Sequence, residues 1–252
     1  MIIAQISDTH ISLDAPDAEQ RIEDFEAVVR DINSLNPLPD LVIHTGDIVH
    51  NGRVDEYARS TEILSKANVP VYGMVGNKDD RRNMREAFSR LQSVSPDSAF
   101  IEYTVDGFPV KLLMLDTLHE GSNKGYFCEE RLQNLNAMIN QEPDRPIAVF
   151  THHPPCEITV GPNLIHFEAG DAMPYLQKAL LSSGQVISVF SGHVHRSTTG
   201  VVEDIPVNVA TAVATPLRRG EYPDHMENRP VYCLHRYDET VGFVTETRIA
   251  GD

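Results

Sequence analysis

The chain has 252 residues, of which 41% are hydrophobic and 23% charged, and its formal net charge at pH 7 is -16. This composition is typical of a globular protein with a substantial core, while the strong negative charge argues against a nucleic-acid polymer or an anionic membrane as a nonspecific partner. A small anionic substrate is compatible with it, because bound metal ions can reverse the local field.

The chain opens with a predicted buried strand at 2–7, and Asp8, Thr9 and His10 come directly after it. Because side chains alternate along an extended backbone, Asp8 and His10 lie on the same side. A carboxylate and an imidazole at one strand end can bind a single divalent metal ion. An Asp-x-His triplet is common by chance, so this interpretation depends on the residues at the ends of the later strands.

Strands and helices alternate in the next part of the chain, which favours an α/β fold of layered sheets and helices. The spacing of apolar residues and the positions of proline and glycine give the boundaries. In order, the expected elements are helix 17–35, strand 40–44, helix 54–67, strand 69–75, helix 81–91, strands 99–104 and 109–115, and helix 129–139. Asp106 and Gly107 predict a hairpin turn between the last two strands.

The remaining part of the chain adds two buried strands, a helix and a β-rich tail. The expected elements are strand 146–150, helix 171–181, strand 186–190, and tail strands 198–202, 207–210, 231–236 and 241–248. Asp171 is the expected N-cap of its helix, with Pro174 in the first turns. Residues 154–174 and 216–229 are the expected rim loops. Because no repeat or long linker divides the chain, we expect a single domain over 1–252, with 197–252 as its β-rich C-terminal part.

Five of the predicted strands each end in a short loop that carries oxygen or nitrogen ligands. These residues are Asp8, His10, Asp47, Asn77, His152, His193 and His195. The ends of parallel strands meet at one edge of a sheet, so we expect these side chains to lie close together. Together they exceed what one metal ion needs, and they suit two ions bridged by a carboxylate and a solvent oxygen. Gly46, Gly76 and Gly192 stand beside them, where the backbone must turn sharply or approach closely.

These motifs, in this order, resemble the signature of the calcineurin-like metallophosphoesterases, which is D-x-H, G-D, G-N-H-D/E, H and G-H-x-H. The matching residues here are Asp8-Thr9-His10, Gly46-Asp47, Gly76-Asn77-Lys78-Asp79, His152 and Gly192-His193-Val194-His195. The match spans about residues 2 to 196, and an ordered match in five parts is highly specific. The local sequences ISDTH, GDIV, HHPP and SGHVH are most similar to the bacterial branch of class III cyclic nucleotide phosphodiesterases and glycerophosphodiesterases.

The resemblance implies a four-layer αββα sandwich of two mixed sheets flanked by helices. It also implies one metal ion held by Asp8, His10 and His195 and a second held by Asn77, His152 and His193. Asp47 and a hydroxide would bridge the two ions. Metal-bound hydroxide would then attack phosphorus in line, and the same ions would neutralise charge on the phosphoryl oxygens. Iron, manganese, zinc and cobalt all suit such nitrogen and oxygen ligands.

Lys78 stands where the family usually has the histidine that contacts the phosphoryl oxygen or protonates the leaving group. A lysine offers three donors and a positive charge, but it is a poor general acid unless its pKa falls from about 10.4. Three interpretations stay open. Lys78 tunes the site to a substrate with a good leaving group or an extra anionic group, it reduces activity to a vestige, or it points away while His153 or His225 takes its place.

The sequence therefore predicts a metal-dependent phosphoric diester hydrolase that acts on a small soluble phosphodiester, either a cyclic nucleotide or a glycerophosphodiester. Asp47, Asn77 and Lys78 are the expected catalytic residues, and Asn77, Lys78, His153 and His225 are the expected substrate contacts. The alternative is a low-activity or non-catalytic member of the fold that binds a nucleotide or a partner, and Lys78 is its only support. A metal-dependent hydrolase of non-phosphate esters is a third hypothesis, because fold and metal do not fix the substrate.

The resemblance and the composition also lead to expectations for the C-terminal part and the cellular location. In the resembling branch, the region equivalent to 197–252 helps to build a lid and an oligomer contact, which allows for a homodimer or a higher homo-oligomer here. No apolar run approaches the roughly 18 residues that span a bilayer, and no signal peptide is evident. The cysteines Cys128, Cys156 and Cys233 are odd in number and lack metal-ligand spacing, so we expect free thiols and a cytoplasmic location.

Overall fold

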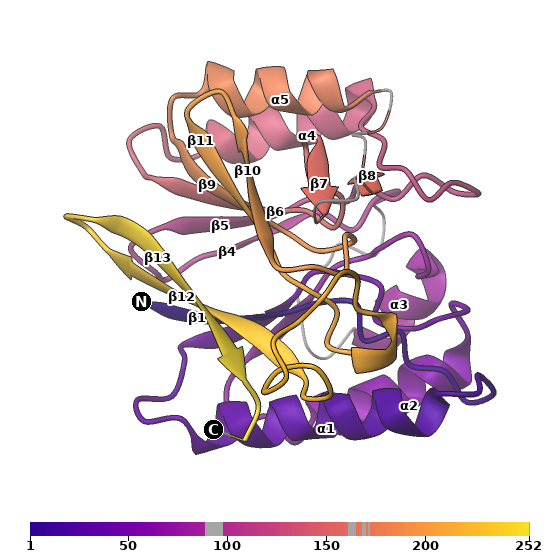
Figure 1. Ribbon diagram of the computed structural model, residues 1–252. Helices are drawn as coiled ribbons and strands as arrows, with labels where there is room; N and C mark the ends of the chain where they lie inside the picture. Colours follow the sequence, from indigo (N-terminus) through magenta and orange to yellow (C-terminus); the bar gives the residue numbers. More distant parts are fainter. Residues whose placement is uncertain (89–97, 161–164, 168–169, 171, 252) are drawn as a thin grey trace.

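Two mixed β-sheets face each other, and helices cover their outer faces (Figure 1). The computed structural model describes residues 1–88, 98–160, 165–167, 170 and 172–251. The helices α1 (Ala18–Ser34), α2 (Val54–Leu64) and α3 (Arg81–Phe88) cover one sheet, while α4 (Glu129–Ile139) and α5 (Met173–Ser182) cover the other. This arrangement is the four-layer α/β sandwich that the sequence predicted.

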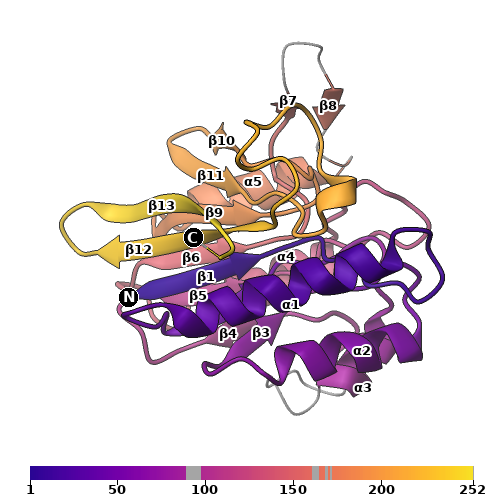
Figure 2. The ribbon, with the colours of Figure 1, turned by 60° about the horizontal axis from the view of Figure 1, so that its bottom comes forward.

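The first sheet has the strand order β13-β12-β1-β2-β3. Its strands are β1 (Ile2–Ile6), β2 (Leu41–His44), β3 (Val71–Gly73), β12 (Val231–Asp238) and β13 (Gly242–Ile249). The first three are parallel to one another, whereas β12 pairs antiparallel with both β1 and β13. Figure 2 shows α1 and α2 running side by side over the outer face of this sheet.

The second sheet has the strand order β10-β11-β9-β6-β5-β4. Its strands are β4 (Tyr103–Val105), β5 (Lys111–Met114), β6 (Ile147–Phe150), β9 (Val186–Ser191), β10 (Thr198–Val202) and β11 (Ile205–Val209). The four inner strands are parallel, and the two edge strands are antiparallel to their neighbours. A separate two-stranded ribbon is formed by β7 (Ile158–Val160) and β8 (Ile165–Phe167).

Apolar periodicity explains how these elements pack. In α1 the buried face includes Phe25, Val28 and Ile32, which follow the spacing of a helix that covers a sheet. The strands β2, β5 and β6 are buried along their whole length, as expected for parallel strands covered on both faces. None of the described helices is long and apolar enough to cross a membrane.

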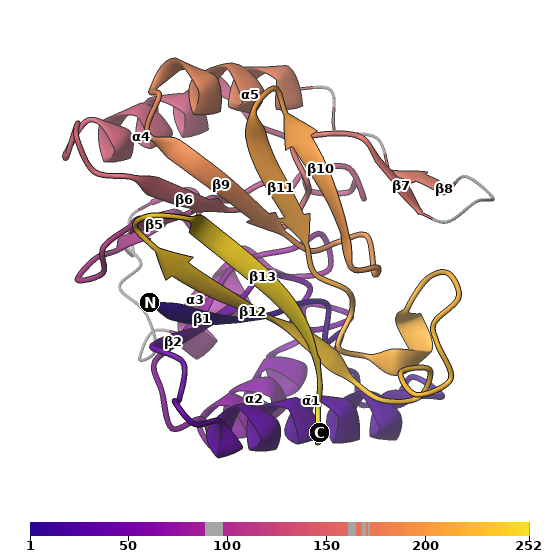
Figure 3. The ribbon, with the colours of Figure 1, turned by 60° about the vertical axis from the view of Figure 1, so that its left-hand side comes forward.

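The C-terminal strands complete both sheets (Figure 3). β10 and β11 extend the second sheet, whereas β12 and β13 return to the first and pair beside the N-terminal strand β1. The predicted tail strands are thus confirmed, and their partners are now known. A role of this part as a lid or an oligomer contact stays a prediction.

Some local expectations differ from the structure. The fifth helix has Ala172 at its N-cap, so the expectation of Asp171 at that position is wrong; Asp171 itself lies outside the described residues. The helix expected over 81–91 ends, as far as it is described, at Phe88, and 89–91 lie outside the described residues. The ribbon β7–β8 lies within the stretch 154–174, which was expected to be a loop. Strands of three residues are too short to show a clear period in the sequence, so the ribbon was not predicted. A short 3₁₀ helix, Thr215–Leu217, overlaps the start of the rim loop expected over 216–229.

Candidate metal centre

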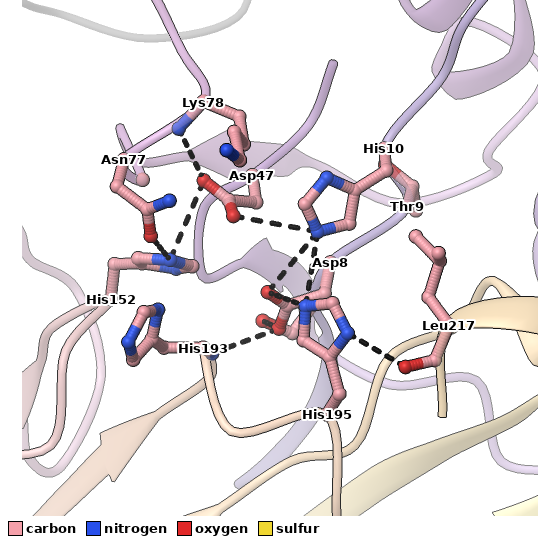
Figure 4. A network of polar contacts seen from close by, with 12 residues as sticks. Asp8, Thr9, His10, Asp47, Asn77, Lys78, His152, His193, His195 and Leu217 are labelled. Carbon is pink, nitrogen blue, oxygen red and sulfur yellow. Dashed lines mark hydrogen bonds and ion pairs between the residues drawn. The ribbon is translucent and has the colours of Figure 1, made fainter. Parts of the chain in front are cut away.

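The polar residues at the strand ends converge on one another (Figure 4). Asp8 and His10 follow β1, Asp47 follows β2 and Asn77 follows β3, all from the first sheet. The second sheet contributes His152 after β6, and His193 and His195 after β9. The sequence led us to expect a single sheet edge, whereas the strand ends of two facing sheets converge on the site.

Four of these residues form a first cluster: the ligand atoms of Asp8, His10, Asp47 and His195 all lie within 4.8 Å of one another. His10 Nε2 lies 3.4 Å from Asp47 Oδ2, and His195 Nε2 lies 3.3 Å from Asp8 Oδ1. The Nε2 atoms of His10 and His195 are 3.1 Å apart. A small cation at the common focus of these atoms would have two carboxylates and two imidazoles around it.

A second cluster is formed by His152, His153 and His193, whose ligand nitrogens also lie within 4.8 Å of one another. Asn77 joins it, because Asn77 Oδ1 lies 3.1 Å from His152 Nε2. Asp47 faces both clusters: its Oδ1 lies 3.5 Å from His152 Nε2, and its Oδ2 points to His10 in the first cluster. One carboxylate is thus placed between two groups of ligand atoms.

Backbone carbonyls orient two of the imidazoles. His152 Nδ1 donates to the carbonyl of Thr45 at 2.8 Å, and His195 Nδ1 donates to the carbonyl of Leu217 at 2.8 Å. Because a carbonyl only accepts, each ring carries its proton on Nδ1 and turns Nε2 toward the site. An outer partner of this kind is usual for a histidine that ligates a metal.

The backbone at the site adopts an unusual conformation. Positive φ angles occur at Asp8, His10, Asp47, His193 and His195, with values from 43° to 68°. Residues other than glycine reach this left-handed region at a cost, and such residues concentrate at functional sites. Five of the predicted ligands share this feature, which argues that the surrounding structure holds them in place for a purpose other than stability.

The glycines beside the candidate ligands let neighbouring loops approach each other closely, as the sequence predicted. A Cβ atom at Gly76 would lie 2.3 Å from both the backbone nitrogen and Oδ1 of Asp47. One at Gly192 would lie 1.9 Å from Ser7 Oγ, and one at Gly46 would lie 2.7 Å from His152 Nδ1. A side chain at any of these positions would displace the loops that carry the ligands.

The chemistry of the residues fits metal ions. Asp8 Oδ1 and His153 Nε2 are buried and have no hydrogen-bond partner among the described residues. A buried carboxylate oxygen that accepts no hydrogen bond depends on nearby positive charge, either from the imidazole of His195 at 3.3 Å or from a bound cation. The set of imidazole nitrogens with carboxylate and amide oxygens is the one that borderline divalent ions prefer.

Without metal, the carboxylates and imidazoles of the site stabilise one another's charged forms, which shifts their pKa values. Burial alone would raise the pKa of Asp8, but the imidazoles of His195 and His10 hold that pKa well below its usual range. Burial disfavours a charged His152, yet Asp47 outweighs this effect and raises the pKa of His152 to about 9. Burial lowers the pKa of His193 to about 3, so this ring stays neutral. A metal ion bound by His152 at neutral pH would therefore displace a proton from this ring.

The metal-free protein should lose stability at alkaline pH through His152. The pKa of this residue is about 9 in the folded state and about 6.5 in the unfolded chain. Because the folded pKa is the higher, its contribution is complete below pH 6.5 and is lost as the pH rises through about 9. We expect the free energy of unfolding of chelator-treated protein to lose up to about 3 kcal/mol over this range. Urea unfolding at several pH values measures it.

Three comparisons isolate this effect. His152→Gln should reduce the alkaline loss and leave only the part due to His195, whose pKa is also raised, by Asp8 against the effect of burial. Saturation with metal should remove the loss, whereas His119→Gln at an exposed position should leave it unchanged. An alkaline loss of the same size in His152→Gln would contradict the assignment to His152.

The remaining predicted site residues differ in where they lie. Lys78 borders the first cluster, where its backbone N–H donates to Asp47 Oδ1 at 2.7 Å and its side chain lies beside Asp47 (Figure 4). His153 is buried within the second cluster, and its Nδ1 lies 2.8 Å from Thr117 Oγ1. His225 is exposed in a C-terminal loop and belongs to neither cluster of the described residues.

Some residues at the site were not singled out as such from the sequence. Asn77 Nδ2 donates to Asn123 Oδ1 at 3.3 Å, so the loop after β5 reaches the second cluster. Asp79 accepts from Gly76 N at 2.8 Å and Ile48 N at 3.2 Å, and so joins the loops after β2 and β3. The aspartate in the G-N-x-D motif hinted at Asp79, whereas no local pattern marked Asn123.

The chain is similar to known proteins over its whole length. The model of the family described as calcineurin-like phosphoesterase matches residues 1–197. A probable glycerophosphodiester phosphodiesterase GpdQ of Arcobacter nitrofigilis is 32% identical, over 100% of this chain and 94% of that protein. The glycerophosphodiester phosphodiesterase GpdQ of Enterobacter lignolyticus is 30% identical, over 93% of this chain and 84% of that protein. A 3',5'-cyclic adenosine monophosphate phosphodiesterase CpdA of Pseudomonas aeruginosa is 28% identical, over 63% of this chain and 57% of that protein.

A solved structure supports the same architecture. A dimetal phosphatase of Danio rerio superposes with a TM-score of 0.73, over 100% of this chain and 99% of that one. Its sequence identity is 16%, so this likeness concerns the fold alone.

Proposed function

Since the chain belongs to the calcineurin-like phosphoesterase family and is a metal-dependent phosphodiesterase, we propose that it hydrolyses small soluble phosphodiesters at a centre of two metal ions. The observation that carries the proposal is the position of Asp47, whose two oxygens face two separate clusters of imidazole nitrogens. A carboxylate between two ions is the arrangement of two-metal hydrolases.

We assign the first ion to Asp8, His10 and His195 and the second to Asn77, His152 and His193, with Asp47 shared between them. The ions, when bound, would supply a hydroxide nucleophile at neutral pH and neutralise charge on the phosphoryl oxygens. Iron, manganese, zinc and cobalt all suit these ligands. His153 Nε2 lies beside the second set and is free to contact an ion or a substrate oxygen.

The chain's own donors would then bind and orient the phosphodiester. The Asn77 amide and the Lys78 ammonium stand at the edge of the two clusters, where they can donate to phosphoryl oxygens. His225 belongs to neither cluster of the described residues, so its role as a substrate contact stays a prediction.

Two substrate classes are proposed, glycerophosphodiesters and cyclic nucleotides. The relatives at 32% and 30% identity bear the name of glycerophosphodiester phosphodiesterases, and a relative at 28% bears that of a cyclic nucleotide phosphodiesterase. The net charge of -16 disfavours a nucleic-acid polymer or an anionic membrane as partner.

The test compares four kinds of ester with the metal-loaded protein. Glycerophosphocholine and cyclic AMP represent the two proposed classes, p-nitrophenyl phosphate is the monoester, and p-nitrophenyl acetate is the carboxyl ester. We expect kcat/KM to be highest for one of the two diesters. A preference for the carboxyl ester would contradict the proposal and support the hydrolase of non-phosphate esters.

A second candidate function is a low-activity or non-catalytic protein that binds a nucleotide or a partner. Lys78, in place of the family's histidine, is the observation that favours it. Tight binding of two metal ions without hydrolysis of any phosphodiester would support this second function over the first.

A prediction for Lys78 separates the three interpretations of this residue. If the ammonium donates to the phosphoryl group, Lys78→Met should lower kcat/KM by about 10²-fold, as the loss of one preorganised donor does. Lys78→His should retain much of the activity and add a limb to the pH profile near the pKa of histidine, about 6.5. The pH dependence of kcat/KM for bis(p-nitrophenyl) phosphate measures both.

Lys178→Met, on the exposed face of α5, serves as the matched control and should leave the rate unchanged. If Lys78→Met were as active as the unmodified protein, Lys78 would have no part in the chemistry. A rise in activity in Lys78→His would support the interpretation that lysine reduces activity to a vestige.

We further propose that the chain acts as one domain in a reducing compartment, with the cytoplasm as the simplest choice. Cys128, Cys156 and Cys233 are all free thiols, as the sequence predicted. Burial raises the pKa of Cys156 to about 11 and that of Cys233 to about 12, so neither is a reactive thiolate at neutral pH. A homodimer or a higher homo-oligomer stays a prediction, which light scattering would test.

A further inference from the structure

We propose that Gln5 is a positioning residue for the metal centre: its buried amide joins the two sheets and holds the strand ends that carry the ligands. The proposal rests on the proposed function, because it requires that these residues bind metal. Gln5 lies on β1, is 0% exposed, and has its hydrogen-bond partners on both sheets.

Three hydrogen bonds to three different strands or strand ends satisfy this amide. Gln5 Nε2 donates to the carbonyl of Ser191 at the end of β9, at 2.9 Å, and to Thr45 Oγ1 just after β2, at 3.0 Å. Gln5 Oε1 accepts from His235 Nε2 on β12 at 2.8 Å. One side chain thus links both sheets through partners that are 40, 186 and 230 residues away in the sequence.

The direction of each hydrogen bond is set by its partners. The Ser191 carbonyl can only accept, so the amide nitrogen must face it and the amide oxygen must face His235. His235 therefore carries its proton on Nε2, and its Nδ1 is left to accept from Thr245 Oγ1 at 2.9 Å. The ring of Phe190 lies 4.2 Å from that of His235, centroid to centroid, and fixes its plane. The network has a single consistent arrangement of protons.

The partners of Gln5 lie immediately before the ligand loops. Thr45 precedes Asp47 by two positions, and its carbonyl accepts from His152 Nδ1 at 2.8 Å. Ser191 precedes His193 by two positions, and Gln5 itself precedes Asp8 by three. A shift of the amide would therefore move the loops that carry most of the proposed ligands, namely Asp8, His10, Asp47, His152, His193 and His195.

A purely structural role would give a different pattern. An amide that only stabilises the sheets could be replaced at a cost in folding stability, with no specific effect on metal binding. Outer residues that orient metal ligands instead change metal affinity by about 10- to 100-fold when they are replaced. Metal affinity compared at equal stability therefore distinguishes the two roles.

The test uses Gln5→Met, which keeps the volume of the side chain and removes all three hydrogen bonds. Metal-free protein is titrated with Mn²⁺ or Zn²⁺ alone in a calorimeter, and thermal unfolding is followed in parallel. We expect affinity about 10- to 100-fold weaker than in the unmodified protein. Should Gln5→Met fail to fold, Gln5→Asn, which is one methylene too short to span the gap, takes its place.

Tyr232→Phe is the matched control. Tyr232 lies on the same strand as His235, is 1% exposed, and donates to Asp31 Oδ2 at 2.6 Å, away from the metal loops. This variant should lose thermal stability and keep its metal affinity. Equal metal affinity in Gln5→Met and the unmodified protein would overturn the proposal, and so would an equal loss of affinity in Gln5→Met and Tyr232→Phe.

His235 supplies a rescue experiment. His235→Gln keeps an N–H donor within reach of Gln5 Oε1 and should retain most of the affinity, whereas His235→Leu should lose it as Gln5→Met does. Equal metal affinity in His235→Gln and His235→Leu would show that the hydrogen bond between His235 and Gln5 does not position the loops that carry the proposed ligands. If the unmodified protein bound no metal, both this proposal and the proposed function would fall. Metal binding without hydrolysis would contradict the proposed function alone.

Discussion

Asp47→Asn is expected to lower kcat for bis(p-nitrophenyl) phosphate by at least about 10³-fold and to remove at least one of the two metal ions. Asp47 is 2% exposed, and its two oxygens face His10 Nε2 at 3.4 Å and His152 Nε2 at 3.5 Å. An amide has nearly the same shape but lacks the charge and one acceptor oxygen, so it cannot hold two cations. Metal content by mass spectrometry is measured beside the rate.

Asp55→Asn is the control for this experiment, because Asp55 is an exposed carboxylate at the start of α2. It should match the unmodified protein in rate and metal content. An Asp47→Asn protein with normal turnover and two bound ions would contradict the centre of two ions proposed here.

Gly76→Ala is the second substitution with a large expected effect. The added Cβ would lie 2.3 Å from the backbone nitrogen of Asp47 and from Asp47 Oδ1, and a backbone cannot move aside as a flexible side chain can. We expect a loss of about 1–3 kcal/mol in the free energy of unfolding from overpacking, together with loss of metal binding. Urea unfolding and calorimetric metal titration measure the two effects.

Gly73→Ala is the matched control on the same segment. Its Cβ would lie 2.9 Å from Phe88 Cε1, which belongs to a core side chain rather than to the metal loops. This variant should lose stability and keep its affinity for metal. Normal metal affinity in Gly76→Ala would show that the loop after β3 need not stay close to Asp47.

The residues that cluster at the candidate metal centre could be singled out from the sequence because each of them comes shortly after a buried strand. The runs 2–7, 40–44, 146–150 and 186–190 are apolar enough to be recognised as strands, and the polar residues stand at short offsets after them. The order of motifs then supplied the family and the fold. The β-rich tail was also predictable, because Val231–Asp238 and Gly242–Ile249 are rich in β-branched and aromatic residues.

Contacts that join distant parts of the chain could not be predicted in this way. The carbonyls of Thr45 and Leu217, which orient His152 and His195, carry no signal in the sequence, because every residue has a carbonyl. The pairing of Gln5 with His235 joins residues 230 positions apart, and local periodicity says nothing about such a pair. The left-handed backbone at Asp8, His10 and the other proposed ligands likewise carries no signal in the local sequence.

The measurement that tests the centre of two metal ions most directly is turnover of bis(p-nitrophenyl) phosphate by chelator-treated protein, re-supplied in turn with manganese, cobalt, zinc and iron. We expect no hydrolysis without metal and full recovery at about two equivalents of at least one of these ions. Hydrolysis that persists after complete removal of metal, or recovery that is complete at one equivalent, would contradict such a centre.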